Sequence, residues 1–220
     1  MGIQQPQKSG MGAGVIVLIL LGVFVLLGGC VGVGAFFMIR RAADDSYTSS
    51  PYTPSTSPTP IATPTPTVTG PYTDKVGRYS VDFPADPKIE SSTDDTELGK
   101  VTLHEAKYEA NKNLVYAVNY TDFPIAGLAF STEGALDGAV NGAAKSGSGK
   151  IVYSNKIKLG TVSGRDFMVK VSDPTTPFRI CSRVFQDGAR QYQVLVLVSE
   201  GQYTSKKSDI DDFLKSFKIL

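Results

Sequence analysis

Few side chains in this sequence have the type and spacing that catalysis or metal binding requires. His104 is the only histidine, so a histidine-based metal site or catalytic triad lacks its other members. His104 and Glu105 are neighbours on an expected strand, which directs their side chains to opposite faces. Asp94, Asp95 and Glu97 offer oxygen ligands for a hard cation, but without the spacing of a calcium-binding loop. We therefore interpret His104 as an ordinary strand residue and the acidic residues as a solvated turn.

Arginine side chains account for two further candidates. Arg165 follows Gly164 and precedes an apolar strand, and its planar guanidinium is suited to holding a carboxylate. We interpret it as one half of a structural ion pair. Cys181 lies on one strand face between Arg179 and Arg183, two cations that favour a reactive thiolate. Because no base or resolving cysteine accompanies it, we favour a small residue buried beneath a helix, with the arginines extending past it.

Catalytic sequence motifs are missing from the chain. It has no G-x-S-x-G, C-x-x-C or H-E-x-x-H pattern. Residues 147–150 (GSGK) resemble a phosphate-binding loop, but they lack its Gly-Lys-Ser/Thr ending and follow an expected helix. Asn119-Tyr120-Thr121 is a formal glycosylation sequon on an expected strand, and we expect it to be unmodified. The sequence therefore predicts no catalytic residue, no cofactor-binding residue and no metal ligand.

The charge and cysteine content exclude further classes of protein. The chain has 22 Lys and Arg residues against 21 Asp and Glu, and the two signs are equally frequent from residue 74 onward. Such a balance leaves no basic patch for nucleic acid. Cys30 and Cys181 are the two cysteines, and Cys30 lies in an apolar run, so we expect no disulfide framework.

That apolar run indicates attachment to a membrane. No charged side chain interrupts residues 15–39, and about 20 such residues suffice for a helix to cross a bilayer. Residues 27–30 (LGGC) have the alternative form of a lipoprotein cleavage site, after which Cys30 would be lipidated. Residues 31–39 remain apolar, however, whereas mature lipoproteins usually continue with polar residues. We therefore predict an intact transmembrane helix over residues 11–39, after a short tail of residues 1–10.

The sequence gives weaker signals for helix dimerisation and for the orientation of the span in the membrane. Gly28 and Gly32 form a G-x-x-x-G pair that allows two helices to approach and dimerise, but glycine is common in membrane helices, so we do not favour a homodimer. Arg40 and Arg41 after the span, against Lys8 before it, slightly favour a cytoplasmic C-terminus. The following segment argues for the opposite orientation.

Residues 40–73 read as a disordered tether. From residue 46 the sequence is SYTSSPYTPSTSPTPIATPTPTVTGPYT, in which proline excludes helices and interior strands. Such Pro/Thr/Ser-rich stalks commonly hold a domain away from a membrane on the exported side. A P-x-x-P ligand for an SH3-type domain at Pro51 and Pro54 lacks basic flanks and is disfavoured. We therefore expect the C-terminal region to be extracytoplasmic.

Residues 74–220 have the pattern of a globular α+β domain. Alternating or continuous apolar residues predict strands, with turn residues between them that favour antiparallel hairpins. A helix with the stripe Leu136, Ala139, Val140 and Ala143 is expected over residues 132–145, and another after Ser208 as N-cap. The expected strands are residues 79–83, 100–108, 114–120, 150–159, 167–171, 178–185 and 191–198.

The segments KIKLG, GRDFMVKV, RVFQDGARQYQVLVLV and IDDFLKSFKIL resemble a domain of membrane-anchored bacterial proteins of unknown function. The opening GRYSVDFPADPKIE matches the first hairpin of that domain. The domain is similar in plan to PsbP, the extrinsic photosystem protein. The resemblance implies an antiparallel sheet between helix layers, a PsbP-like α/β/α sandwich, and it implies no functional residues.

Two classes of function follow from these observations. The first is a non-enzymatic binding or accessory domain held at the cell membrane, whose partner is an envelope protein or a wall component. The second is an envelope enzyme of hydrolase type that uses carboxylates. The missing nucleophile–base pairs favour the first class, and no cofactor is expected.

Overall fold

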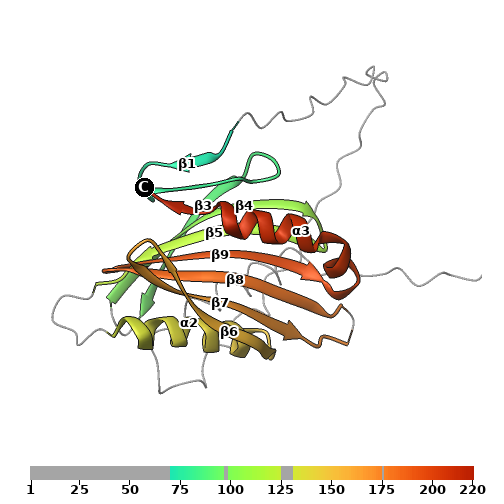
Figure 1. The fold of residues 1–220 in the computed structure, drawn as a ribbon. Coiled ribbons are helices and arrows are strands. Elements are labelled where there is room, and N and C mark those ends of the chain that lie inside the picture. Colours follow the sequence, from blue (N-terminus) through green and yellow to red (C-terminus); the bar gives the residue numbers. More distant parts are fainter. Residues whose placement is uncertain (1–69, 97–98, 125–130, 175) are drawn as a thin grey trace, which may run out of the picture.

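The computed structural model describes residues 70–96, 99–124, 131–174 and 176–220. The expected span, Cys30, the Gly28/Gly32 pair, the tether up to residue 69 and Glu97 lie outside these residues. Among the helices of the described part, none is long and apolar enough to cross a membrane. The described chain is an α+β structure of two antiparallel sheets with helices packed on them (Figure 1).

Seven strands form the large sheet in the order β3-β4-β5-β9-β8-β7-β6, and each neighbouring pair is antiparallel. Residues 191–198 in the central β9 are all buried, which confirms that this apolar run is a strand covered on both faces. The strands are β3 (Lys88–Thr96), β4 (Gly99–Asn111), β5 (Leu114–Asp122), β6 (Lys150–Leu159), β7 (Val162–Val171), β8 (Phe178–Asp187) and β9 (Arg190–Ser199).

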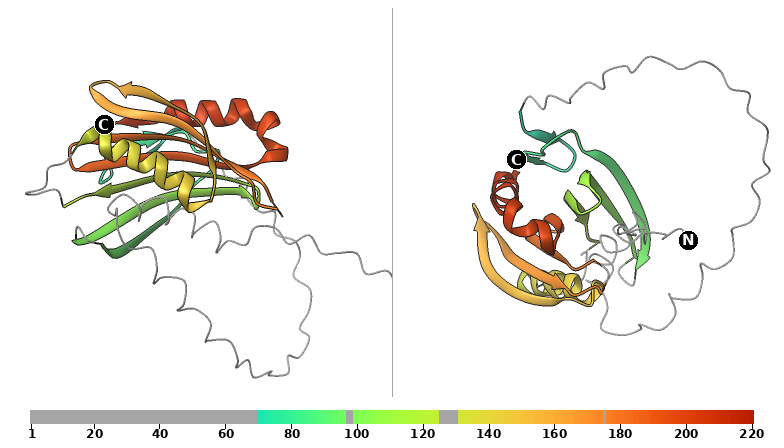
Figure 2. Two further views of the ribbon diagram at one scale, coloured as in Figure 1. Left: turned by 90° about the horizontal axis from the view of Figure 1, so that it is seen from below. Right: turned by 90° about the vertical axis from the view of Figure 1, so that its right-hand side faces the viewer.

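Two helices cover opposite faces of this sheet, which is strongly curved when seen end-on (Figure 2). α2 (Thr132–Ser146) packs on β6, β7 and β8, and α3 (Glu200–Ser216) packs on β8, β9 and β2. The strand residues alternate between the two cores: Val194 and Val196 belong to the α3 side, and Leu195 and Leu197 to the α2 side. The expected layered plan, a sheet between helices, is therefore present.

α3 begins more than two turns before its expected start. Its N-cap is Ser199, whereas Ser208 lies in the helix interior and is exposed. The first turns of α3 face solvent, and residues 201–208 are almost entirely polar. This part of the helix therefore has no apolar stripe from which a helix could be predicted. The buried residues are Ile210, Phe213 and Leu214, all in the second half.

A small three-stranded sheet was not expected from the sequence. It consists of β1 (Tyr72–Asp74), β2 (Tyr79–Val81) and β10 (Lys218–Ile219), in the order β1-β2-β10. β2 and β3 therefore lie in different sheets, and the hairpin expected for GRYSVDFPADPKIE is wrong. Pro84 and Pro87 lie in the connection, where their missing N–H groups prevent continued strand pairing.

Candidate functional site

A groove of about 350 Å³ lies between the small sheet and one end of the large sheet. β1 and the turn after it contribute residues 72–76, and β2 contributes Tyr79. On the other side lie Ile89 of β3, residues 104–106 of β4, and Tyr120 of β5. The N-terminal end of the domain thus forms one side of the groove, and the β3–β4–β5 half of the large sheet forms the other.

Two large apolar side chains are exposed at this groove. Val76 is 74% exposed and Ile89 is 55% exposed, although both residue types are usually buried. A ligand that covers these side chains would lower the free energy of the system by roughly 25 cal/mol per Å² of apolar surface removed from water. The other exposed large hydrophobic residues in the described chain, Val152 and Leu220, do not line the groove.

Aromatic rings form the deeper part of the groove. The ring of His104 stacks on Tyr120 with 4.5 Å between centroids and 12° between planes, and Ser91 Oγ lies 2.9 Å from His104 Nδ1. Burial is the main cause that raises the pKa of both Tyr120 and Tyr79 above the ordinary 10.0. Both phenols are therefore neutral near pH 7, and because Tyr79 is 1% and Tyr120 is 3% exposed, their rings form the packed floor of the groove.

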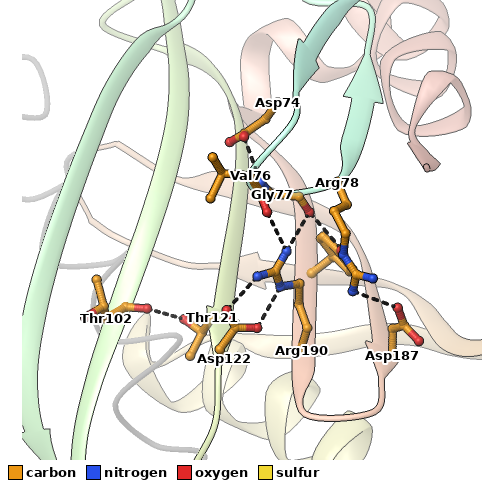
Figure 3. A network of polar contacts seen from close by, with 10 residues as sticks. Asp74, Val76, Gly77, Arg78, Thr102, Thr121, Asp122, Asp187 and Arg190 are labelled. Carbon is orange, nitrogen blue, oxygen red and sulfur yellow. Dashed lines mark hydrogen bonds and ion pairs between the residues drawn. The ribbon is translucent and has the colours of Figure 1, made fainter.

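The turn between β1 and β2 is fixed by Arg190 of β9 (Figure 3). Its Nη1 donates to the carbonyl oxygens of Val76 and Gly77 at 2.8 and 3.0 Å, while its Nε and Nη2 each donate to Asp122 at 2.6 Å. Tyr192 Oη also donates to Gly77 O at 2.8 Å. The guanidinium thereby attaches one wall of the groove to the large sheet.

Gly77 is required in this turn by close packing. A Cβ at this position would lie 2.7 Å from the ring of Tyr79 and 2.8 Å from the ring of Tyr120. The Gly77 N–H donates to Asp74 Oδ1 at 2.7 Å, which closes the turn from within. A larger residue at position 77 would therefore collide with these rings and displace the turn that forms the groove wall.

The groove combines apolar and aromatic side chains with a few polar ones. Asp74 and Lys75 are its charged side chains of opposite sign, and His104 contacts a serine and a tyrosine. Glu105 points to the opposite face, where burial raises the pKa of its carboxyl and Lys107 lies 3.8 Å away. Within residues 70–220 as described, no three His, Cys, Asp or Glu side chains converge to hold a metal ion.

Asp94 and Asp95 lie within strand β3, paired with Val101 and Lys100 of β4, and not in the turn that the sequence predicted. Arg165 contacts Glu133 at 2.7 Å and Asp137 at 2.8 Å, and this ion pair joins β7 to α2 as the sequence favoured. Cys181 is 2% exposed, and burial raises the pKa of its thiol to about 12. The Asn119 side chain is fully buried, so the folded domain does not present its sequon.

His104 was a candidate residue from the sequence, whereas Arg190, Val76 and Ile89 were not. Arg190 follows an expected turn and has no motif around it, and Asp122 lies 68 residues away. Val76 and Ile89 are isolated apolar residues in polar segments, a pattern that predicts neither strand nor helix. Their proximity depends on the small sheet, which the sequence did not reveal.

Comparison with known proteins gives only distant similarities. No protein-family model and no curated protein matches the sequence. Among solved structures, PsbP from Synechocystis sp. PCC 6803 is 10% identical and matches 69% of this chain and 92% of its own, with a TM-score of 0.46. LpqN, involved in cell envelope biogenesis of Mycobacterium tuberculosis, is 9% identical over 64% of this chain and 82% of its own, with a TM-score of 0.39.

A third solved structure, PA94 of unknown function from Pseudomonas aeruginosa, is 6% identical over 64% of this chain and 89% of its own, with a TM-score of 0.33. At TM-scores below 0.5, these similarities carry no argument about ligand or activity.

Proposed function

We propose that this chain is a single-pass membrane protein with a non-catalytic binding domain on the extracytoplasmic side, and that the groove beside β1 is its binding site. The observation that supports a binding role is the exposure of Val76 and Ile89 at one groove. Binding sites combine such apolar surface with a few polar groups that orient the ligand. Asp74, Lys75 and His104 are polar residues of this groove.

The rigid attachment of the groove wall also supports this role. Arg190 and Tyr192 fix the turn that carries Val76 before any ligand is present. A preformed site loses less conformational entropy on binding than one that must become ordered.

Membrane attachment and orientation rest on the sequence. The uninterrupted apolar run of residues 15–39 is the support for a span, and the Pro/Thr/Ser-rich segment after it supports export of the domain. The partner is accordingly an envelope protein or a wall component. A stalk extended at about 3.1 Å per residue gives the domain access to partners away from the bilayer.

The binding site is tested by site-specific photocrosslinking in intact cells. A photoreactive amino acid replaces Val76 or Ile89 in the full chain, and in the matched control it replaces Val152, which is 54% exposed on β6. We expect specific adducts of one mass from the two groove positions and none from position 152. Absence of adducts at both groove positions, or the same adducts at all three, contradicts the proposed site.

The orientation is tested independently with protease added to spheroplasts. Cleavage within residues 46–73 should release a soluble fragment that contains the domain, while a cytoplasmic marker protein stays intact. Protection of the domain until the membrane is broken would show the opposite orientation, as Arg40 and Arg41 suggest. A domain protected in this way would still have its groove, so the two experiments test separate parts of the proposal.

A further inference from the structure

The outer edge of β1 carries unpaired backbone groups. β1 is the terminal strand of the small sheet and pairs only with β2 among the described strands. Along a strand in an antiparallel sheet, the backbone groups of successive residues face opposite neighbouring strands. The N–H of Leu220 donates to Arg78 O, so the backbone groups of residues 78 and 80 face β10. Residues 79 and 81 therefore bond to β1, opposite Asp74 and Tyr72. The intervening Thr73 must direct its N–H and C=O away from β2.

The groove borders this edge. All three β1 residues line it, including the exposed Thr73, whose side chain points away from the half-buried face that Tyr72 and Asp74 share. From the rest of the small sheet only Tyr79 lines it. A ligand in the groove thus meets the Thr73 backbone on one side and Ile89 and His104 on the other.

We propose that the ligand is an extended polypeptide segment of a partner protein, which binds in the groove as an additional strand beside β1. This deepens the proposed function and rests on it. The outward N–H and C=O of Thr73 are complementary to another polypeptide backbone, which presents a carbonyl acceptor and an N–H donor at the matching spacing. An apolar side chain of the added strand covers Val76 and Ile89, and the nearly balanced charge of the groove favours a segment without strong net charge.

The edges of the large sheet are less suited to such addition. β6 carries a register shift between Ile151 and Tyr153 and exposed lysines along its length, which are features that prevent edge pairing. β3 carries mainly charged and small polar side chains, and only its Ile89 reaches a groove. The edge of β1 borders the groove in which both Val76 and Ile89 are exposed.

The full chain in detergent micelles is used to select binders from a heptapeptide display library. We expect enriched peptides with apolar residues at alternate positions, as an added strand requires. A labelled synthetic copy of the best peptide is then titrated by fluorescence anisotropy. Methylation of a backbone nitrogen that faces β1 should weaken its binding by about tenfold, since it removes one hydrogen bond, and methylation of the next nitrogen should have a smaller effect.

Variants of Thr73 provide the matched test on the protein. Thr73→Pro removes the outward N–H and fixes φ at an edge position, which edge strands tolerate, and should weaken binding by about tenfold. Thr73→Val keeps the N–H and should change binding by less than about twofold. Far-ultraviolet circular dichroism of both variants checks that they remain folded, and the N-methylated peptides keep the test valid should Thr73→Pro unfold.

The outcomes separate this inference from the proposed function. Peptides that lose binding with Ile89→Asp but tolerate both methylation and Thr73→Pro use the groove without adding a strand, which overturns the inference and leaves the binding site standing. Enriched peptides that are rich in proline and insensitive to methylation overturn it in the same way. Peptides indifferent to Ile89→Asp, or a failure to enrich any peptide, contradict the polypeptide ligand, and photocrosslinking then decides whether the groove binds another class of ligand.

Discussion

Arg190 and Asp122 form a two-point ion pair, with Nε–Oδ1 and Nη2–Oδ2 distances that are both 2.6 Å. They are cross-strand neighbours in the register of β5 and β9. The guanidinium also stacks over Tyr120, 4.7 Å from the ring centroid, and donates to the carbonyl oxygen of Val76. One side chain therefore connects the floor of the groove to its wall, and the hydrogen bond between Asp122 and Arg190 is the main cause that lowers the pKa of Asp122.

Replacement of Arg190 by alanine should lower the free energy of unfolding by about 1–3 kcal/mol, because backbone carbonyl groups in the turn lose charged donors. The Coulombic share is small, since the Asp122 side chain is 56% exposed. Arg78→Ala is the matched control in the same turn: its ion pair with Asp187 is 3.4 Å long and exposed. We expect a change below about 1 kcal/mol for this control in urea unfolding. Equal losses for the two variants would mean that Arg190 has no special role.

Phe217 joins the small sheet to the large one. It is 2% exposed, stacks on Phe185 with centroids 5.7 Å apart, and lies equally close to Tyr79 and Tyr192. Phe217→Ala should lower the free energy of unfolding by about 3–5 kcal/mol through lost burial and a residual cavity. The control is Leu220→Ala, at a position 63% exposed, with an expected change within about 0.5 kcal/mol. Denaturant titration of both variants checks this, and a loss near that of the control would show that Phe217 is poorly packed.

Six of the seven strands of the large sheet, all except β3, were predictable because period-2 or continuous apolar patterns encode burial directly. β9 is the clearest case, since residues 191–198 are apolar at most positions and all buried. α2 was also predictable to within one residue, because Leu136, Ala139, Val140 and Ala143 form an apolar stripe, and all four are buried. Local sequence contained the required information in both cases.

The groove was not predictable for the opposite reason. β1 and β10 have three and two residues, too few to show any periodicity, and their pairing depends on segments at the two ends of the domain. β3 is an edge strand with mainly polar side chains, so it lacks the apolar pattern of a strand. The Arg190–Asp122 pair and the exposure of Val76 become visible only once these strands are in place.

The Cys181 thiol should react slowly in the native protein. Burial is the main cause that raises its pKa to about 12, and it outweighs the opposing effect of the Arg179 guanidinium. In a Cys30→Ser background, a disulfide reagent near pH 8 should label Cys181 at least about a hundredfold more slowly in the native state than in denaturant. Labelling at similar rates in both states would show that the thiol is accessible, and that Arg179 and Arg183 activate it.

Glu200 should make folding stability depend on pH in the acid range. Arg179 donates to both of its carboxylate oxygens at 2.7 and 2.8 Å and is the main cause that lowers the Glu200 pKa from 4.5 to about 2. Below pH 4.5 the unfolded chain takes up a proton that the folded chain still excludes, so this contribution to stability is complete above about pH 4.5 and is lost as the pH falls toward 2. The exposed fraction of 31% limits the contribution to about 1 kcal/mol.

Glu200→Gln should therefore be less stable than the unaltered protein at about pH 6, and the difference should shrink by about pH 3. Asp212→Asn is the control, since this carboxylate lies exposed on the same helix and forms no ion pair within the described residues. Urea unfolding at the two pH values measures both variants. Because Glu133 and the other carboxylates are unchanged in each protein, their titration cancels in the comparison. A difference between the Gln variant and the unaltered protein that stays constant from about pH 6 to about pH 3 would show that the Arg179–Glu200 pair does not couple folding to this ionisation.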